Sequence, residues 1–283
     1  MAEGIIIKIN SGIYTVKSGI EIINCSLRGK FRIDGITPYV GDRCVVSNDV
    51  ITDILPRKNY MIRPRLANID MLLVVFSASN PKPQLDIIDK ITVMAELKNI
   101  TPVIVITKSD LSDEKTVGFY KNIYDLTGYK VIVTALDEKN DIDFFLEKEL
   151  RGGLAAVAGC SGVGKSTLLN RLLGNCTLKT GEISAKNKRG RHTTTCIQLF
   201  ERYGGFIADT PGFASFEVGE IKQNEVENYF PEIRGRLGKC RFKGCSHINE
   251  PDCPVKDALI KGEFAKSRYD NYVKIYNDLK PAY

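Results

Sequence analysis

The sequence lacks any apolar run that approaches 18 residues, so we expect no membrane-spanning helix. Its first residues, MAEGIIIKIN, lack the basic segment and long apolar stretch of a secretory signal peptide. We therefore expect a cytoplasmic protein. The chain also shows no internal repeat and no low-complexity tract. Histidine is scarce, with 2 residues in 283, and each of them falls in a motif described below.

Excess positive charge is confined to the two ends of the chain. Residues 1–66 carry 10 Lys and Arg against 6 Asp and Glu, a net charge of +4. Residues 67–220 have a net charge of −1, and residues 221–283 one of +3. An ordinary solvated surface would explain this excess. The functional interpretation is that the flanks contact a polyanion such as nucleic acid.

The first segment, residues 1–66, reads as a small β-barrel. Glycine-containing turns separate five short runs of strand-forming residues: Gly4–Asn10, Ile13–Lys17, Ile20–Cys25, Phe31–Ile33 and Arg43–Asn48. Five short strands in a segment of this length predict an OB-fold, a fold that often binds nucleic acid.

The second segment, residues 67–220, alternates strands and helices. The predicted strands are Met71–Ser77, Val103–Thr107, Val131–Thr134, Leu154–Ala158, Ile197–Phe200 and Phe206–Ala208. The predicted helices are Leu85–Leu97, Glu114–Leu126, Phe144–Leu150 and Lys165–Leu173. This alternation predicts a doubly wound α/β domain, which binds ligands at the carboxyl ends of its strands. The third segment, residues 221–283, is predicted to be a helical domain with a cysteine-rich insertion.

A phosphate-binding loop lies between a predicted strand and helix of the second segment. The GxxxxGK[ST] pattern is matched by Gly159, Cys160, Ser161, Gly162, Val163, Gly164, Lys165 and Ser166, and Thr167 extends the loop. Its glycines allow the backbone to present N–H groups to phosphate. We expect Lys165 to reach the β- and γ-phosphates and Ser166 to ligate Mg²⁺.

A DxxG motif, Asp209 to Gly212, follows the last predicted strand. We expect Asp209 to hold Mg²⁺ through a water molecule and the Gly212 N–H to contact the γ-phosphate. Alone, this tetrapeptide is a common turn sequence. Its place after the phosphate loop, at the end of a strand, favours the GTPase interpretation.

The base-reading motif is formed by Thr107, Lys108, Ser109 and Asp110, with Thr107 where Asn is usual. The Asp110 carboxylate can accept hydrogen bonds from guanine N1–H and the 2-amino group, neither of which adenine offers. At the end of the next strand, Ala135 is expected to contact guanine O6 through its N–H. The base motif precedes the phosphate loop, the reverse of the order in Ras-like GTPases. This order predicts a circularly permuted domain.

Ras-like GTPases place a glutamine after the DxxG motif to orient the water that attacks the γ-phosphate. Here Phe213 occupies that position and cannot hydrogen-bond to water. Residues 180–195 form a polar stretch that we expect to be the mobile switch over the γ-phosphate. Within it, Thr194 is our preferred Mg²⁺ ligand, with Thr193 as the alternative. His192 is the candidate to orient the attacking water or accept its proton. The competing interpretations are a surface histidine and a catalytic group supplied by a partner.

The third segment concentrates three thiols and an imidazole in a short stretch: Cys240, Cys245, His247 and Cys253. Zn²⁺ favours four tetrahedral sulfur and nitrogen ligands, and a Cys₃His set is typical of structural sites. Four protein ligands leave no open position for catalysis. The sequence therefore predicts one structural zinc, against the alternative of free cysteines in a loop.

The chain resembles the RsgA family, also called YjeQ, in five motifs and in their order. They are TKSD, GCSGVGKST, GRHTTT, DTPGF and CRFKGCSHINEPDC. The resemblance implies an OB-fold, a permuted GTPase domain and a zinc domain. It implies GTP hydrolysis that the small ribosomal subunit stimulates, a role in late maturation of that subunit, and contact with its rRNA. The proposed catalytic histidine of the family aligns with His192.

Three further expectations complete this interpretation. GTP and GDP are the expected nucleotides, Mg²⁺ and Zn²⁺ the expected ions, and a monomer the expected state.

A competing hypothesis is a nucleic-acid-binding module with a passive nucleotide site; an ATP-dependent enzyme is disfavoured by Asp110. Because the DxxG motif leads within a few residues into the third segment, a switch movement could reorient the zinc domain.

Overall fold

The computed structural model describes residues 2–33, 35–135, 141–174, 197–209 and 221–279. They belong to two compact units. The first unit comprises residues 1–71, 143–157 and 166–213, and the second comprises residues 72–142, 158–165 and 214–283. The second unit thus joins the C-terminal segment to the part of the chain that carries the TKSD motif. The division into domains 1–66, 67–220 and 221–283 stays a prediction.

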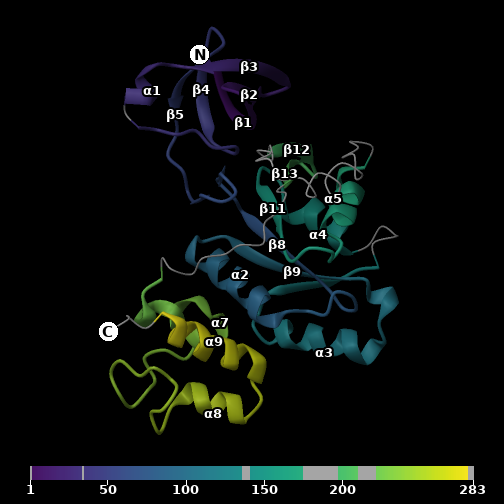
Figure 1. The fold of residues 1–283 in the computed structure, drawn as a ribbon, viewed down its shortest axis with the longest axis vertical. Helices are drawn as coiled ribbons and strands as arrows, with labels where there is room; N and C mark the ends of the chain where they lie inside the picture. The colour runs from purple at the N-terminus through teal and green to yellow at the C-terminus, as the bar shows by residue number, and fades with distance from the viewer. Residues whose placement is uncertain (1, 34, 136–140, 175–196, 210–220, 280–283) are drawn as a thin grey trace, which may run out of the picture. The chain divides into compact units, whose positions relative to one another are not determined.

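A closed five-stranded barrel forms the N-terminal part of the first unit (Figure 1). Its strands are β1 (Ala2–Asn10), β2 (Ile13–Ser18), β3 (Glu21–Leu27), β4 (Arg43–Ser47) and β5 (Val50–Ile54). They follow the order β1-β2-β3-β5-β4, and β4 pairs back onto β1. All pairs are antiparallel except β3 with β5. This closure gives the predicted OB-type barrel, with Ile6, Val16 and Ile51 in its core.

One predicted strand of the barrel is wrong, and another was missed. Phe31–Ile33 belongs to a short helix, α1 (Lys30–Ile33), from which Phe31 packs into the barrel core. The fifth strand is instead β5, which follows β4 after Asn48 and Asp49. Both of these residues have positive φ, 50° and 58°, as a two-residue type I′ hairpin turn requires.

The rest of the first unit contains strands and helices of the predicted α/β domain. Strand β11 (Leu154–Ala158) pairs in parallel with β13 (Gly205–Asp209), and β13 forms an antiparallel hairpin with β12 (Gln198–Arg202). Helices α4 (Asp141–Glu149) and α5 (Lys165–Leu173) accompany these strands. The barrel continues from this sheet, because β1 meets β12 at Lys8 and Gln198. A two-stranded ribbon of β6 (Tyr60–Met61) and β7 (Leu66–Ala67) lies at the exit of the barrel sequence.

The second unit contains three adjacent strands, β8 (Met71–Ser77), β9 (Thr101–Thr107) and β10 (Lys130–Val133). Every residue of β8 is buried, as its continuous apolar run predicts. Helix α2 (Leu85–Leu97) matches its predicted bounds, and α3 (Glu114–Asp125) ends one residue early. A single 3₁₀ turn, η1 (Ser109–Leu111), follows β9.

The C-terminal segment is helical, as predicted, and packs on α2 in the same unit (Figure 1). It consists of η4 (Gln223–Tyr229), α7 (Pro231–Arg234), α8 (Pro254–Ile260) and α9 (Lys266–Asp278). Val93 of α2 shares a core with Val226, Phe230 and Tyr272. None of the helices in the described part of the chain is long and apolar enough to cross a membrane.

Beneath this contact lies a buried ionic cluster around Arg268 of α9. Its guanidinium donates to the carboxylates of Asp89 and Glu232, each with a shortest distance of 2.7 Å. All three side chains are almost fully buried. The cluster fixes α9 against α2 through charges that have no access to water.

Candidate functional site

The phosphate loop begins with a glycine that no other residue could replace. Gly159 has φ +146°, and a Cβ at this position would lie 2.1 Å from the carbonyl oxygen of Val75. The backbone at Gly159 therefore lies too close to that of Val75 in strand β8 to leave room for a side chain. Within the loop, Val163 is buried, Cys160 and Gly164 are half-buried, and Ser161 and Gly162 are exposed. The exposed part of the loop is the part that would face a phosphate group.

The TKSD motif is hydrogen-bonded directly to the phosphate loop. The buried hydroxyl of Thr107 donates to the carbonyl of Val163 at 2.6 Å. The Lys108 ammonium donates to the carbonyls of Gly162, at 2.9 Å, and Asn80. Thr107 and Lys108 of the base-reading motif thus contact Gly162 and Val163 of the phosphate loop within the second unit. The threonine that replaces the usual asparagine supplies the polar contact between the two motifs.

The end of β9 presents Asp110 to solvent. Lys108 adopts a left-handed conformation with φ 55°, which turns the chain from β9 into η1, and Asp110 is exposed there. Strand β10 pairs with β9 in parallel, with Val133 opposite Ile106. The half-buried Ala135 follows β10 and so belongs to the same edge of the sheet. The exposed Asp110 and the half-buried Ala135 thus follow adjacent parallel strands, at the edge where a purine base is expected.

Lys165 has the electrostatics of an anion-binding lysine. Its ammonium donates to the Cys160 carbonyl, and burial lowers the pKa of Lys165, an effect that the nearby Cys160 partly offsets. A phosphate beside this ammonium would favour its charged form. An anion bound beside Lys165 would therefore offset the effect of burial.

The predicted magnesium residues in the first unit lie at the start of α5 and the end of β13. Ser166 and Thr167 are exposed at the first turn of α5. Burial raises the pKa of the Asp209 carboxyl, and a divalent cation beside it would offset that effect. The parallel pairing of β11 and β13 places their carboxyl ends at one edge of the sheet. His192, Thr193, Thr194, Gly212 and Phe213 lie outside the described residues.

The four predicted metal ligands form a compact cluster in the second unit. The ligand atoms of Cys240, Cys245, His247 and Cys253 all lie within 4.8 Å of one another and could hold a metal ion. Burial raises the pKa of Cys245 to about 12 and also raises that of Cys240. A cation is therefore needed to stabilise these thiols as thiolates. The donor set, three sulfurs and one imidazole, fits zinc.

Polar contacts from outside the cluster fix the backbone of this metal loop. The carboxylate of Glu250 accepts the N–H groups of Ser246 and Ile248 at 2.8 and 3.1 Å. The hydroxyls of Tyr269 and Tyr272, both on α9, donate to the carbonyls of residues 247 and 246 at 2.7 Å each. The loop is thus attached to α9 independently of any metal.

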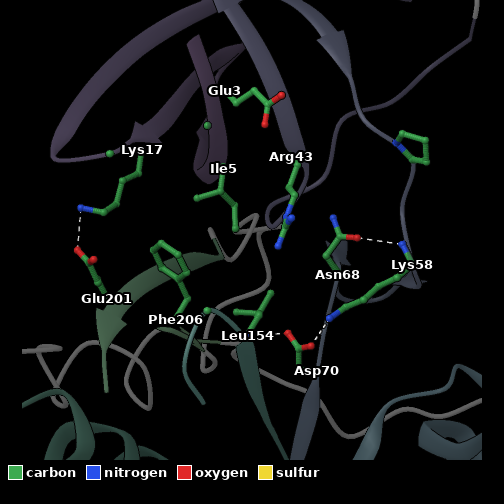
Figure 2. Close-up of a pocket in the computed structure, with 15 residues that line it drawn as sticks. Glu3, Ile5, Lys17, Arg43, Lys58, Asn68, Asp70, Leu154, Glu201 and Phe206 are labelled. Atoms are coloured by element: carbon green, nitrogen blue, oxygen red, sulfur yellow. Dashed lines mark hydrogen bonds and ion pairs between the residues drawn. The ribbon is translucent and has the colours of Figure 1, made fainter. Parts of the chain in front are cut away.

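A separate cavity of about 590 Å³ lies in the first unit, between barrel residues and the ends of β11–β13 (Figure 2). Ile5, Leu154 and Phe206 supply apolar walls. Charged residues on its walls pair with one another, Lys17 with Glu201 at 2.7 Å and Lys58 with Asp70. None of the predicted nucleotide or metal residues lines it. The cavity is therefore a junction between structural elements of the first unit and not part of a predicted site.

Sequence reasoning missed two residues of these sites. Asn80 holds Lys108 through its carbonyl, and a backbone acceptor leaves no signature in a sequence. Glu227 lies 3.0 Å from the Nε2 atom of His247. Its place in η4, well before the cysteine-rich stretch, gave no sign of that contact.

Comparisons with known proteins agree with the motifs and the fold. The family model described as RsgA GTPase matches residues 54–219, and that of the RsgA N-terminal domain matches residues 3–52. Curated relatives named small ribosomal subunit biogenesis GTPase RsgA include those of Geobacillus kaustophilus and Alkaliphilus metalliredigens. They are 43% and 41% identical over 288 residues, covering 99% of this chain and 98% of each relative.

Two solved structures resemble the whole chain. The crystal structure of YjeQ from Thermotoga maritima has a TM-score of 0.84 at 37% identity and covers 100% of this chain and 99% of its own. That of YloQ, described as a circularly permuted GTPase, has a TM-score of 0.81 at 36% identity and covers 100% and 97%. These matches confirm the predicted permuted GTPase fold with its N-terminal barrel, and the chain belongs to the RsgA family of GTPases.

Proposed function

We propose that this GTPase assists late maturation of the small ribosomal subunit, is stimulated by that subunit, and binds rRNA through its flanking segments. It acts in the cytoplasm as a monomer and hydrolyses GTP to GDP and phosphate. The contact between Thr107 and the Val163 carbonyl, at 2.6 Å, carries the nucleotide part of this proposal. It joins the base-reading motif and the phosphate loop into one site.

Each residue of the nucleotide site has a role in this proposal. Asp110 accepts the guanine N1–H and 2-amino groups, and Lys108 lies along the base. The Ala135 N–H donates to guanine O6. Backbone N–H groups of residues 159–164 surround the phosphates, and Lys165 neutralises the β- and γ-oxygens.

Magnesium and the attacking water involve residues from several motifs. Ser166, Thr194 and Asp209 would hold Mg²⁺, which when bound neutralises charge that develops on the phosphates. The Gly212 N–H contacts the γ-phosphate, and His192 orients the water. The raised pKa of Asp209, caused by burial, supports a cation at this position.

The C-terminal cluster would hold one zinc ion through Cys240, Cys245, His247 and Cys253. Its role is structural, because four protein ligands complete a tetrahedral site. The ribosomal part of the proposal is supported by the names of the relatives and by the charge of +4 and +3 on the two flanks.

Multiple-turnover GTP hydrolysis, measured alone and with purified small or large ribosomal subunits, tests the proposal. We expect a slow intrinsic rate, roughly 10⁻⁴ to 10⁻² per second, and stimulation by small subunits only. Equal turnover with and without small subunits would favour a passive nucleotide site.

His192→Ala should remove most of the stimulated rate, because loss of a positioned acid–base group costs about 10²- to 10⁴-fold. GTP affinity should stay near that of the parent. Lys165→Ala provides the contrast, since its charge is required for ground-state binding and its loss should weaken affinity. Full stimulated turnover by His192→Ala would instead assign the catalytic group to the ribosome.

A further inference from the structure

The two ring nitrogens of His247 have chemically different neighbours. Nδ1 lies 3.5 Å from the Cys240 sulfur and 3.3 Å from the Cys253 sulfur. Nε2 points the other way and lies 3.0 Å from the Oε2 atom of Glu227. The ring is almost fully buried, with 2% of its side chain exposed. Its orientation is therefore set by protein groups on both sides.

The spacing on the Nδ1 side is that of a zinc site. With Zn–S bonds of about 2.3 Å and a Zn–N bond of about 2.0 Å, a tetrahedron places sulfurs about 3.8 Å apart and nitrogen about 3.5 Å from sulfur. The sulfurs of Cys245 and Cys253 are 3.8 Å apart, and Nδ1 is 3.3 and 3.5 Å from its sulfur neighbours. The nitrogen that faces the thiols, Nδ1, is the one that can bind the metal.

We propose that Glu227 is a positioning residue of this metal site. Its carboxylate accepts a hydrogen bond from Nε2–H of His247, which holds the imidazole in the neutral tautomer whose Nδ1 lone pair is free for zinc. The inference rests on the zinc site of the proposed function and adds to it the ligand atom and the group that selects it.

The position of Glu227 is itself fixed by the core of the second unit. Val226, its neighbour in η4, is fully buried against Phe230 and Tyr272. At the start of the same element, the Gln223 side chain donates to the Tyr276 carbonyl at 3.0 Å. The carboxylate of Glu227 remains a quarter exposed, at 26%. A carboxylate on a fixed backbone can hold the ring orientation without being buried itself.

An ion pair between Glu227 and a doubly protonated His247 is the structural alternative. In that case both ring nitrogens would carry protons, and Nδ1 could not bind a cation. The two interpretations therefore predict opposite states of Nδ1 in the zinc-loaded protein.

Long-range ¹H–¹⁵N correlation spectra of the zinc-loaded, full-length chain distinguish these states. We expect His247 to show a metal-bound Nδ1 and a protonated Nε2. With 2 histidines in the chain, the spectrum of His192→Ala assigns the signals. A zinc-bound Nε2, or protons on both nitrogens, would overturn the proposal. This measurement on the parent protein does not depend on how any Glu227 variant folds.

Competition of the zinc-loaded protein with a chromophoric chelator provides the second readout. Glu227→Ala should lower the zinc affinity measured by this competition about 10- to 100-fold, the usual effect of losing such a partner. Glu227→Gln should recover part of this loss, because its amide oxygen still accepts a hydrogen bond. Glu225→Gln is the matched control, since Glu225 lies on the same element and pairs with Lys222 at 3.7 Å.

These experiments test the role of Glu227 separately from the presence of the zinc site. Parent-like zinc retention by Glu227→Ala would remove the role of Glu227 and leave the zinc site intact. A parent protein that holds no zinc would remove the site, and the inference with it, while GTP hydrolysis would still test the nucleotide part of the function.

Discussion

At the scale of single residues, Thr107 shows how a departure from a motif is accommodated. Its hydroxyl lies 2.6 Å from the Val163 carbonyl and 3.2 Å from that of Phe76, and its side chain is fully buried. Asparagine would reach the same region with an amide. A threonine suffices here because the two carbonyls lie close to the end of β9.

Thr107→Val should therefore weaken both nucleotide binding and folding. Valine keeps the shape of the side chain but leaves the Val163 carbonyl without this donor, and an unsatisfied buried acceptor costs about 1–3 kcal/mol. GDP affinity and urea denaturation measure the two effects. Thr107→Ser, which keeps the hydroxyl, is the control. Parent-like affinity and stability in Thr107→Val would show that this hydroxyl does not link the two motifs.

Asp110→Asn should change which purine the site prefers. The exposed carboxylate is expected to accept two guanine hydrogen bonds, whereas an amide can donate to the 2-oxo group of xanthine. Competition between GTP and XTP should show weaker GTP binding and a preference shifted toward XTP. A variant that rejects XTP as strongly as the parent would show that the base lies elsewhere.

At the scale of elements, the buried ionic cluster joins α9 to α2. Arg268→Met should lower the free energy of unfolding by about 3–5 kcal/mol, because it leaves the carboxylates of Asp89 and Glu232 buried without a counter-charge. Chemical denaturation measures this loss. Lys266→Gln is the control on the same helix; its ion pair with Asp270 is exposed and contributes about 0–1 kcal/mol. Similar small effects for both variants would mean that water reaches the cluster.

Element prediction from the sequence worked where periodicity was long and failed where it was short. Helices α2 and α5 have the predicted bounds, because apolar spacing and the phosphate loop define them. Phe31–Ile33 was mistaken for a strand, since three residues cannot distinguish period 2 from period 3.6. Strand β5 was missed, although Asn48 and Asp49, which precede it, are typical of a tight hairpin turn.

Long-range charge pairing could not be predicted at all. The four residues of the metal cluster were found because their spacing is local and their chemistry is specific. Arg268 and Asp89 lie 179 residues apart in sequence, and each reads as an ordinary charged surface residue of a helix. Only the packing of α9 on α2 brings them together. The contact between Glu227 and His247 was not predicted for the same reason.

At the scale of the whole molecule, charge distribution predicts how binding to small subunits responds to salt. The flanks carry +4 and +3, whereas the middle segment carries −1. If the flanks contact rRNA phosphates, affinity should fall linearly on a log–log plot against salt, with a slope of about 0.7–0.9 per phosphate contact. Sedimentation with small subunits over a salt series measures this slope. Salt-independent binding would indicate an interface made mainly with ribosomal proteins.

The ionic cluster of α9 and α2 also determines which parts of the chain can open together. A helix held to its neighbour by a water-excluded arginine cannot separate from it without exposing three charges at once. Amide hydrogens of α2 and α9 should therefore exchange with the same free energy of opening, as one cooperative unit, although the two helices stand at distant points of the chain. A nucleotide-driven swing of the C-terminal domain away from α2 would have to break this unit. Movement of the domain together with the guanine-reading strands would not.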